Sequence, residues 1–405
     1  MNIKYISKRI LIIYMSIIII SCNTKVPSEN KEDNPDNDNV VVDDDSDDNI
    51  NDNDATNDDY INDDEGNDDV EVTLYASGEW ANWVSPFNIE EKCLVEEFNA
   101  NNWNDHYIDY GCYLYSLWGT DKYNIWIVGQ SGLQWIYKGL LVHYDGFTWD
   151  INEDENMWNI VFYGIWGISN KNIYAVGMKG REEGITFGNR HEYVVYQYNG
   201  YHWSVVVQGY ELNSILTGIW YEAANEVYAV GYWEAQSDNK SGYLILQYDG
   251  KEWSEQRSNY GALSGIWGMA SDEVYAVGNQ PSEGTNKRPL IMKYNGKWEE
   301  MKNNIQDGIY FHSIMGNSDM DLYAVGGCIT NIYDGGVVFH YDGEEWKDMG
   351  LRHGGYLTSI WVYSSNNIYV AGTWGIIHYN GEKWEDEYHA EGTSINDLWG
   401  INQNK

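Results

Sequence analysis

The sequence predicts an all-β fold, a seven-bladed β-propeller, and three observations lead to this prediction. The chain holds 20 Trp, 35 Tyr and 41 Gly in short apolar runs, which favours strands and turns over helices. A three-part unit recurs about every 48 residues. The last copy of this unit is incomplete, and its missing parts lie before the first copy.

The repeated unit has the parts expected of one blade. Its first part is an apolar strand that ends in Ile-Trp-Gly or a variant, with the Trp or Met at Trp118, Trp166, Trp220, Trp267, Met315, Trp361 and Trp399. The second part reads Val-Tyr-Ala-Val-Gly, as in Val274–Gly278, and the third is Tyr-Asp/Asn-Gly followed by Trp, as in Tyr248–Trp253. A period of roughly 40–50 residues in short strands is typical of four-stranded propeller blades. One such sheet cannot bury both of its faces, whereas a closed ring gives every blade two neighbours.

The ring is predicted to close by sharing one blade between the two ends of the domain. Ile395–Gly400 matches the first part of the unit, but no second part follows it. Leu74–Gly78 matches the second part, and Phe98–Trp103 matches the third. Six complete blades and this shared blade make seven.

At these repeats, over residues 73–405, the sequence resembles bacterial propeller repeats of the Asp-box (BNR) and photosystem-assembly-factor type. The Asp-box places Gly two residues and Trp five residues after Asp, whereas here they usually follow at one and four, so sialidase chemistry is not carried over. The Asp position is filled by Asn99, Asp145, Asn199, Asp249, Asn295, Asp342 and Asn380. Because Asn stands there in four blades of seven, we interpret the position as a turn residue that tolerates positive φ.

Residues 1–21 are predicted to be a lipoprotein signal peptide. Lys4, Lys8 and Arg9 precede the apolar run Ile10–Ile20, which is too short to span a hydrocarbon core of ~30 Å. Ile19–Cys22 resembles the bacterial lipobox, which implies cleavage before Cys22 and acylation of that residue. The alternative is an ordinary secretory signal with a coincidental Cys. By analogy with lipoproteins, Asn23 favours anchoring in the outer membrane or at the cell surface.

Residues 22–72 are predicted to be a disordered acidic linker. Residues 23–72 carry 20 Asp and Glu but only two Lys, and they have too little apolar surface to offset the entropy of ordering. A flexible chain of this length spans roughly 40 Å. The linker contains no EF-hand calcium loop, because Ile61 stands where the loop that includes Gly66 needs Asp. Residues 73–405 hold 43 acidic and 19 basic residues. This balance argues against nucleic acids and anionic membrane surfaces as partners, because both repel it, and it predicts a monomer.

Three further cysteines are Cys93, Cys112 and Cys328, an odd number that excludes a full disulfide framework. Cys93 and Cys112 either pair in an oxidising compartment or remain buried thiols, and the sequence leaves both readings open. No Cys-x-x-Cys and no His-Glu-x-x-His motif occurs, so we predict neither a metal site nor a cofactor.

The candidate binding face is the edge of the ring where the repeats differ. Four loops there are long and dissimilar (residues 179–192, 232–241, 279–288 and 327–336). Three residues before the Trp or Met of each first strand lies a column that we expect to ring the channel mouth: Tyr115, Tyr163, Thr217, Ser264, His312, Thr358 and Asn396. Together with exposed rings of Tyr310 and Tyr356, this column is the predicted ligand site. The alternative is that its polar groups only satisfy loop backbones.

The sequence thus predicts a lipid-anchored module that binds a protein or a glycan, with the lipid anchor as its only membrane contact. One alternative is an extracytoplasmic carbohydrate-active enzyme, whose acids would be Asp397, Glu183, Asp307 and Glu391. Another, by analogy with the photosystem-type repeats, is an envelope assembly factor. The fold itself does not decide among these functions.

Overall fold

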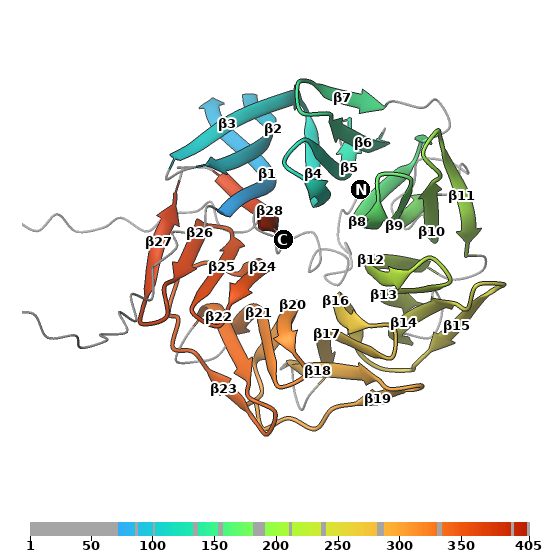
Figure 1. The fold of residues 1–405 in the computed structure, drawn as a ribbon, viewed down its shortest axis with the longest axis vertical. Helices are drawn as coiled ribbons and strands as arrows, with labels where there is room; N and C mark the ends of the chain where they lie inside the picture. Colours follow the sequence, from blue (N-terminus) through green and yellow to red (C-terminus); the bar gives the residue numbers. More distant parts are fainter. Residues whose placement is uncertain are drawn as a thin grey trace, which may run out of the picture. The chain divides into compact units, whose positions relative to one another are not determined.

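The computed structural model describes residues 72–85, 88–99, 102–132, 137–152, 157–180, 191–209, 213–235, 240–281, 287–329, 334–389 and 393–402. These residues form seven antiparallel sheets of four strands each, arranged as blades around a ring (Figure 1). The described residues contain no α-helix. The predicted all-β, seven-bladed propeller is therefore confirmed. Within these ranges, no helix is long and apolar enough to cross a membrane.

The blades are numbered here in chain order, beginning with the blade that contains the first strand. Blade 1 consists of β28 (Thr393–Asn402), β1 (Val72–Ser85), β2 (Asn88–Asn99) and β3 (Asn102–Tyr110), and blade 2 of β4 (Cys112–Asp121), β5 (Asn124–Ser131), β6 (Lys138–Tyr144) and β7 (Trp149–Asn152). Blade 3 consists of β8 (Ile160–Ser169), β9 (Asn172–Gly180), β10 (His191–Tyr198) and β11 (Trp203–Gln208), and blade 4 of β12 (Asn213–Ala223), β13 (Glu226–Glu234), β14 (Ser241–Tyr248) and β15 (Trp253–Arg257). Blade 5 consists of β16 (Ala262–Ala270), β17 (Glu273–Pro281), β18 (Lys287–Tyr294) and β19 (Trp298–Glu300). Blade 6 consists of β20 (Ile309–Ser318), β21 (Asp321–Ile329), β22 (Asp334–Tyr341) and β23 (Trp346–Asp348), and blade 7 of β24 (Leu357–Ser364), β25 (Asn367–Gly372), β26 (Gly375–Tyr379) and β27 (Trp384–Tyr388).

The ring closes in blade 1, as the incomplete repeat predicts. Strand β28, from the end of the chain, pairs antiparallel with β1, from Val72 opposite Asn402 to Trp80 opposite Thr393. It takes the innermost position in its blade, which β4, β8, β12, β16, β20 and β24 take in the others (Figure 1). Closure gives each of the seven blades a neighbouring blade on both sides.

The Ile-Trp-Gly motif joins neighbouring blades. The Trp118 ring of blade 2 lies against Gly167 of blade 3, where an added Cβ would come within 2.5 Å of the indole. Trp220 of blade 4 covers Gly268 of blade 5 in the same way. At these joints, and where Trp361 packs on Gly400, the Gly makes room for the Trp of the preceding blade, and burial of the indole stabilises the joint.

The turn between the third and fourth strands is held by the Asp or Asn side chain. Asp249 Oδ1 accepts hydrogen bonds from the backbone N–H groups of Lys251 and Glu252, both at 2.9 Å. Asn199 accepts two equivalent bonds at 3.1 Å. The structural reading of this position is confirmed, but its physical basis differs from the prediction, because the positive φ belongs to the following Gly alone (87° at Gly250).

Successive strands of a blade are antiparallel, so each strand runs from one face of the ring to the other. Successive loops therefore lie on alternate faces. We call one of them the short-turn face; it carries the tight connections, such as 170–171 between β8 and β9. The opposite face, called the variable face, carries the second-to-third loops and the connections between blades. Of the predicted variable loops, residues 181–190, 236–239, 282–286 and 330–333 lie outside the described residues.

Candidate functional site

Every residue of the predicted mouth column is the extra residue of a β-bulge in an innermost strand. In blade 3, Phe162 pairs with Gly177 and Gly164 pairs with Val176, which leaves Tyr163 as the inserted residue. A Cβ on Gly177 would overlap the carbonyl oxygen of Val161. The Gly that ends each Val-Tyr-Ala-Val-Gly motif therefore permits the close backbone approach at the bulge.

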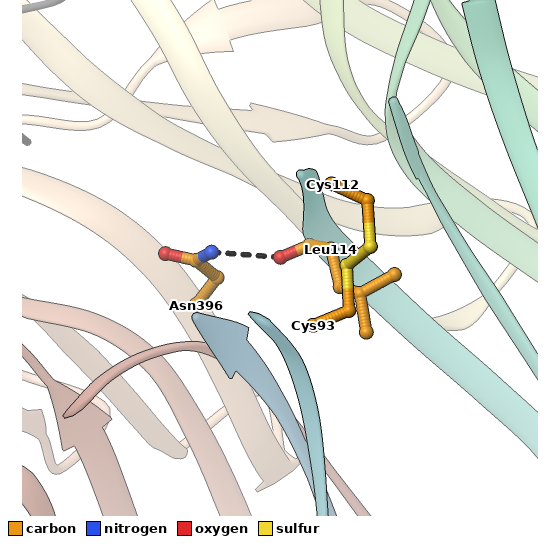
Figure 2. The surroundings of a disulfide bond; sticks show 4 residues. All are labelled: Cys93, Cys112, Leu114 and Asn396. Atoms are coloured by element: carbon orange, nitrogen blue, oxygen red, sulfur yellow. Dashed lines mark hydrogen bonds between the residues drawn. A yellow bond between two sulfur atoms is a disulfide. The ribbon is translucent and has the colours of Figure 1, made fainter. Parts of the chain in front are cut away.

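Three polar members of the column link adjacent blades. The Thr217 hydroxyl lies 3.2 Å from the Val230 carbonyl of its own blade and 3.1 Å from the Leu263 carbonyl of blade 5. The Thr358 hydroxyl lies 2.8 Å from the Ile395 carbonyl. Asn396 Nδ2 donates to the Leu114 carbonyl at 2.7 Å, from β28 to β4 (Figure 2). These side chains satisfy backbone groups between blades and stabilise the ring.

The aromatic members of the column belong to a first aromatic cluster on the variable side of blades 2 to 4. The rings of Tyr115 and Tyr163 lie 5.1 Å apart, and Tyr113 stacks against Tyr115 at 6.5 Å. All three are half-buried. The cluster is completed by Tyr137 and Tyr232, which pack with Tyr115 and Tyr163 around Val161, Met178 and Ile215. The cluster therefore groups five aromatic rings on this side of the ring.

A second aromatic cluster lies between blades 5, 6 and 7. The Tyr310 ring lies 5.3 Å from His312 and 6.0 Å from Tyr356, and the Lys287 ammonium lies 5.2 Å from the Tyr310 ring centre. The expectation that Tyr310 is exposed is wrong, because these neighbours bury it to 7% exposure. Burial, with a smaller contribution from Lys287, lowers the pKa of His312 to about 4, so the imidazole is neutral at neutral pH.

A shallow groove adjoins this second cluster on blade 7. It is lined by Tyr356, Leu357, Trp374 and Ile377, together with His353, Thr373 and three glycines. Trp374 occupies the two-residue connection between β25 and β26 and is 46% exposed. His389 stacks on the indole and lies 2.7 Å from its backbone carbonyl through Nδ1. The sequence reasoning missed this groove, because such a short connection carries no signal of variability.

The four carboxylates of the enzyme alternative are not brought together among the described residues. Asp397 accepts hydrogen bonds from the hydroxyls of Ser116 and Ser359 at 2.8 and 2.6 Å and from the backbone of Leu117 at 3.0 Å. Burial raises its pKa against the effect of these bonds. Asp307 is exposed in the connection between blades 5 and 6, while Glu183 and Glu391 lie outside the described residues. Asp397 therefore fastens β28 to β4 and β24.

No group of three or more His, Cys, Asp or Glu side chains is arranged for a metal ion within the described ranges. Cys93 of β2 and Cys112 of β4 form a disulfide, with Cα atoms 5.6 Å apart (Figure 2). This bond settles the alternative that the sequence left open. Cys328 is buried in β21. Cys22 and the acidic linker up to residue 71 lie outside the described residues.

No protein-family model matches the sequence, and no curated protein matches it either. Among solved structures, the chain is similar to YCF48 bound to D1 peptide, with 18% identity and a TM-score of 0.44 over 67% of this chain and 80% of that one. It is similar to the GH74 xyloglucanase from Xanthomonas campestris, with 11% identity and a TM-score of 0.46 over 76% of this chain and 52% of that one. It is also similar to the β-propeller domain of the Trilobed protease from Pyrococcus furiosus, with 13% identity and a TM-score of 0.39 over 70% and 97% of the two chains. These neighbours are β-propeller proteins, and the likeness concerns the fold alone.

Proposed function

We propose that this protein is a lipid-anchored binding module outside the cytoplasm, which recognises a protein or a glycan through its variable face. One observation carries the proposal: the chain enters the ring on the opposite face. Val72, the first residue of β1, pairs with Asn402 at the short-turn end of β28. The described chain therefore begins on the short-turn face, so a tether from Cys22 would reach the ring on the face opposite the proposed binding surface.

The two aromatic clusters supply the contact residues of the proposed interface. Tyr and Trp are enriched at protein interfaces because they offer large, rigid surfaces that also form hydrogen bonds. Tyr115 and Tyr163 provide such a surface on one side of the ring axis, and Tyr356 and Trp374 provide one on the other. The linking residues Thr217, Thr358 and Asn396 hold the strands that carry these rings.

The Cys93–Cys112 disulfide supports a location in an oxidising compartment, since such bonds rarely persist in the cytosol. The anchor is tested by Cys22→Ser. We expect this variant to leave the membrane fraction or to remain uncleaved, and to lose labelling with palmitate. A variant that fractionates and labels as the parent does would show that Cys22 is not the anchor.

The binding face is tested by pull-down with the full chain, followed by titration of the captured partner. We expect Tyr163→Ala with His312→Ala to weaken binding by more than about 1 kcal/mol, roughly a fivefold change, if these side chains are hot spots. Asp249→Asn on the short-turn face is the control, because Asn fills the same turn position in other blades. If the control loses binding while the double variant keeps it, recognition lies on the short-turn face and the proposed site is wrong.

A further inference from the structure

Six described turns join third and fourth strands on the short-turn face, and two of them differ from the rest at one position. The residue after the turn Gly is charged in four blades: Lys251, Lys297, Glu344 and Glu382. In the neighbouring blades 2 and 3 it is aromatic. Phe147 is 91% exposed and Tyr201 is 88% exposed, more than any other large hydrophobic side chain among the described residues. The fold does not require aromatic residues there, since blades 4, 6 and 7 make the same turn without them and blade 5 makes a turn that is one residue shorter.

Two more exposed side chains extend this apolar surface on the same two blades. Tyr123, 59% exposed, precedes β5 and lies against the Phe147 turn, where a Cβ on Gly146 would come within 3.0 Å of it. Ile168 near the end of β8 is 42% exposed. The Lys122 ammonium lies 5.3 Å from the Tyr123 ring centre. We call Tyr123, Phe147, Ile168 and Tyr201 the apolar edge.

The area of the apolar edge is too small for a stable protein interface. Large side chains bury roughly 150–250 Å² each, so four partly exposed ones supply on the order of 600 Å². A stable complex buries about 800 Å² per partner. A lipid surface needs no complementary shape, and it accepts protruding aromatic rings at headgroup level with lysine beside them.

The chain enters the ring on the same face, through Val72. We propose that the apolar edge docks this propeller on the lipid surface that holds its anchor, which fixes the variable face outward. This inference rests on the proposed function, because it needs the anchor at Cys22. The ring domain carries a net charge of −24, from 43 acidic and 19 basic residues, so docking proceeds by apolar insertion against electrostatic repulsion.

The test is neutron reflectometry of the lipidated full chain in a supported bilayer of phosphatidylethanolamine and phosphatidylglycerol. We expect the propeller layer of the parent to touch the headgroups. The variant Phe147→Glu with Tyr201→Glu gives both turns the residue found at Glu344 and Glu382, and its layer should move outward by up to roughly 40 Å, the span of the linker. The matched control, Lys251→Glu with Lys297→Glu, makes a larger charge change at the same turn position and should stay docked. Thermal unfolding of all three checks the fold.

Salt separates this mode of docking from electrostatic attachment. Raising NaCl to about 0.5 M screens the repulsion, so the parent layer should remain at the headgroups. A gap between bilayer and parent, an unmoved double variant or an equal displacement of the control would overturn the proposal. If the bilayer retains no protein, the proposed anchor at Cys22 is wrong, and the docking proposal that rests on it is wrong too. Self-association of the parent without lipid, abolished in the double variant, would assign the apolar edge to a second copy of the chain.

Discussion

Neighbouring blades are held together by different contacts at blade 1 and at a joint such as that between blades 4 and 5. At the joint between blades 4 and 5, Trp220 covers Gly268 and the Thr217 hydroxyl reaches the Leu263 carbonyl. Blade 1, built from both ends of the described ring, has further bonds to both neighbours. We call these bonds the seam: the Cys93–Cys112 disulfide, the Asp397 hydrogen bonds and the bond from the Tyr388 hydroxyl to Glu96. Apolar packing and hydrogen bonds hold the other joints, as the bond from the Tyr193 hydroxyl to Glu255 does between blades 3 and 4. The sheet that joins the two ends of the described ring carries a disulfide as well.

Removal of the closing strand β28 is expected to have the largest effect on the stability of the ring. Deletion of residues 395–405 takes away the innermost strand of blade 1 and exposes β1 and the Trp361 ring that packs on Gly400. We expect the free energy of unfolding to fall by more than about 5 kcal/mol, measured by urea denaturation. Deletion of residues 23–69 serves as the control and should leave the melting temperature unchanged. Equal stability of the closure deletion and the parent would disprove a shared blade.

Glu96 gives the seam a pH dependence. Burial raises its pKa from 4.5 to about 8, against the hydrogen bond from Tyr388 and with a smaller contribution from the neighbouring Asp105 carboxyl group. A carboxyl group with a raised folded-state pKa contributes full stability below its ordinary pKa, and this contribution is lost as pH rises through 8. Glu96→Gln should therefore be more stable than the parent by roughly 3–5 kcal/mol at about pH 9 and similar at pH 4.5.

Urea denaturation across this pH range measures the effect, with Glu344→Gln at an exposed turn as the control. A constant difference between parent and Glu96→Gln at every pH would contradict a protonated Glu96 in the folded state.

Removal of the disulfide tests its share of the seam. The disulfide joins residues 19 positions apart. Cys93→Ser with Cys112→Ser should therefore lower the free energy of unfolding by about 3 kcal/mol. Treatment of the parent with dithiothreitol should reproduce the loss, and the double variant should not respond to the reductant. A parent whose stability is the same with and without reductant would show that the bond contributes nothing to closure.

Asp397 provides a smaller effect at the same place. Asp397→Ala leaves the hydroxyls of Ser116 and Ser359 and the Leu117 N–H without their acceptor, and we expect a loss of about 2 kcal/mol. Gly218→Ala, in the equivalent position of blade 4, is the comparison at a continuous joint, where an added Cβ would come within 3.1 Å of Ile266. Restoration of stability in Asp397→Ala by Ser116→Ala with Ser359→Ala would identify the unpaired hydroxyls as the cause.

The smallest effect belongs to the turns. Asp249→Asn keeps the oxygen that accepts from Lys251 and Glu252, so the melting temperature should not change. Asp249→Ala removes that acceptor and should lower it measurably. If Asp249→Asn lowers the melting temperature as much as Asp249→Ala does, the turn depends on the carboxylate charge and not only on the accepting oxygen.

The ring and its shared blade could be predicted because the residues that pack blades together recur in each repeat. For example, Trp118 of one blade packs on Gly167 of the next. The bulges at the mouth column were not predicted, since a bulge is set by the register between two strands. The Gly that ends each second strand is the signal that could have found them. The seam contact between Glu96 and Tyr388 joins residues separated by 292 positions and leaves no local pattern.

Blade 1 also sets the order of events in folding. Its outer three strands are made first, but its innermost strand, Thr393–Asn402, is the last described strand to be synthesised. Until then β1 presents an open edge that can pair with other chains. Contacts over such a sequence separation form slowly. The nascent ring is therefore an open arc until Thr393–Asn402 is made, and the time between the first described strand and the last is when it is most exposed to misassembly.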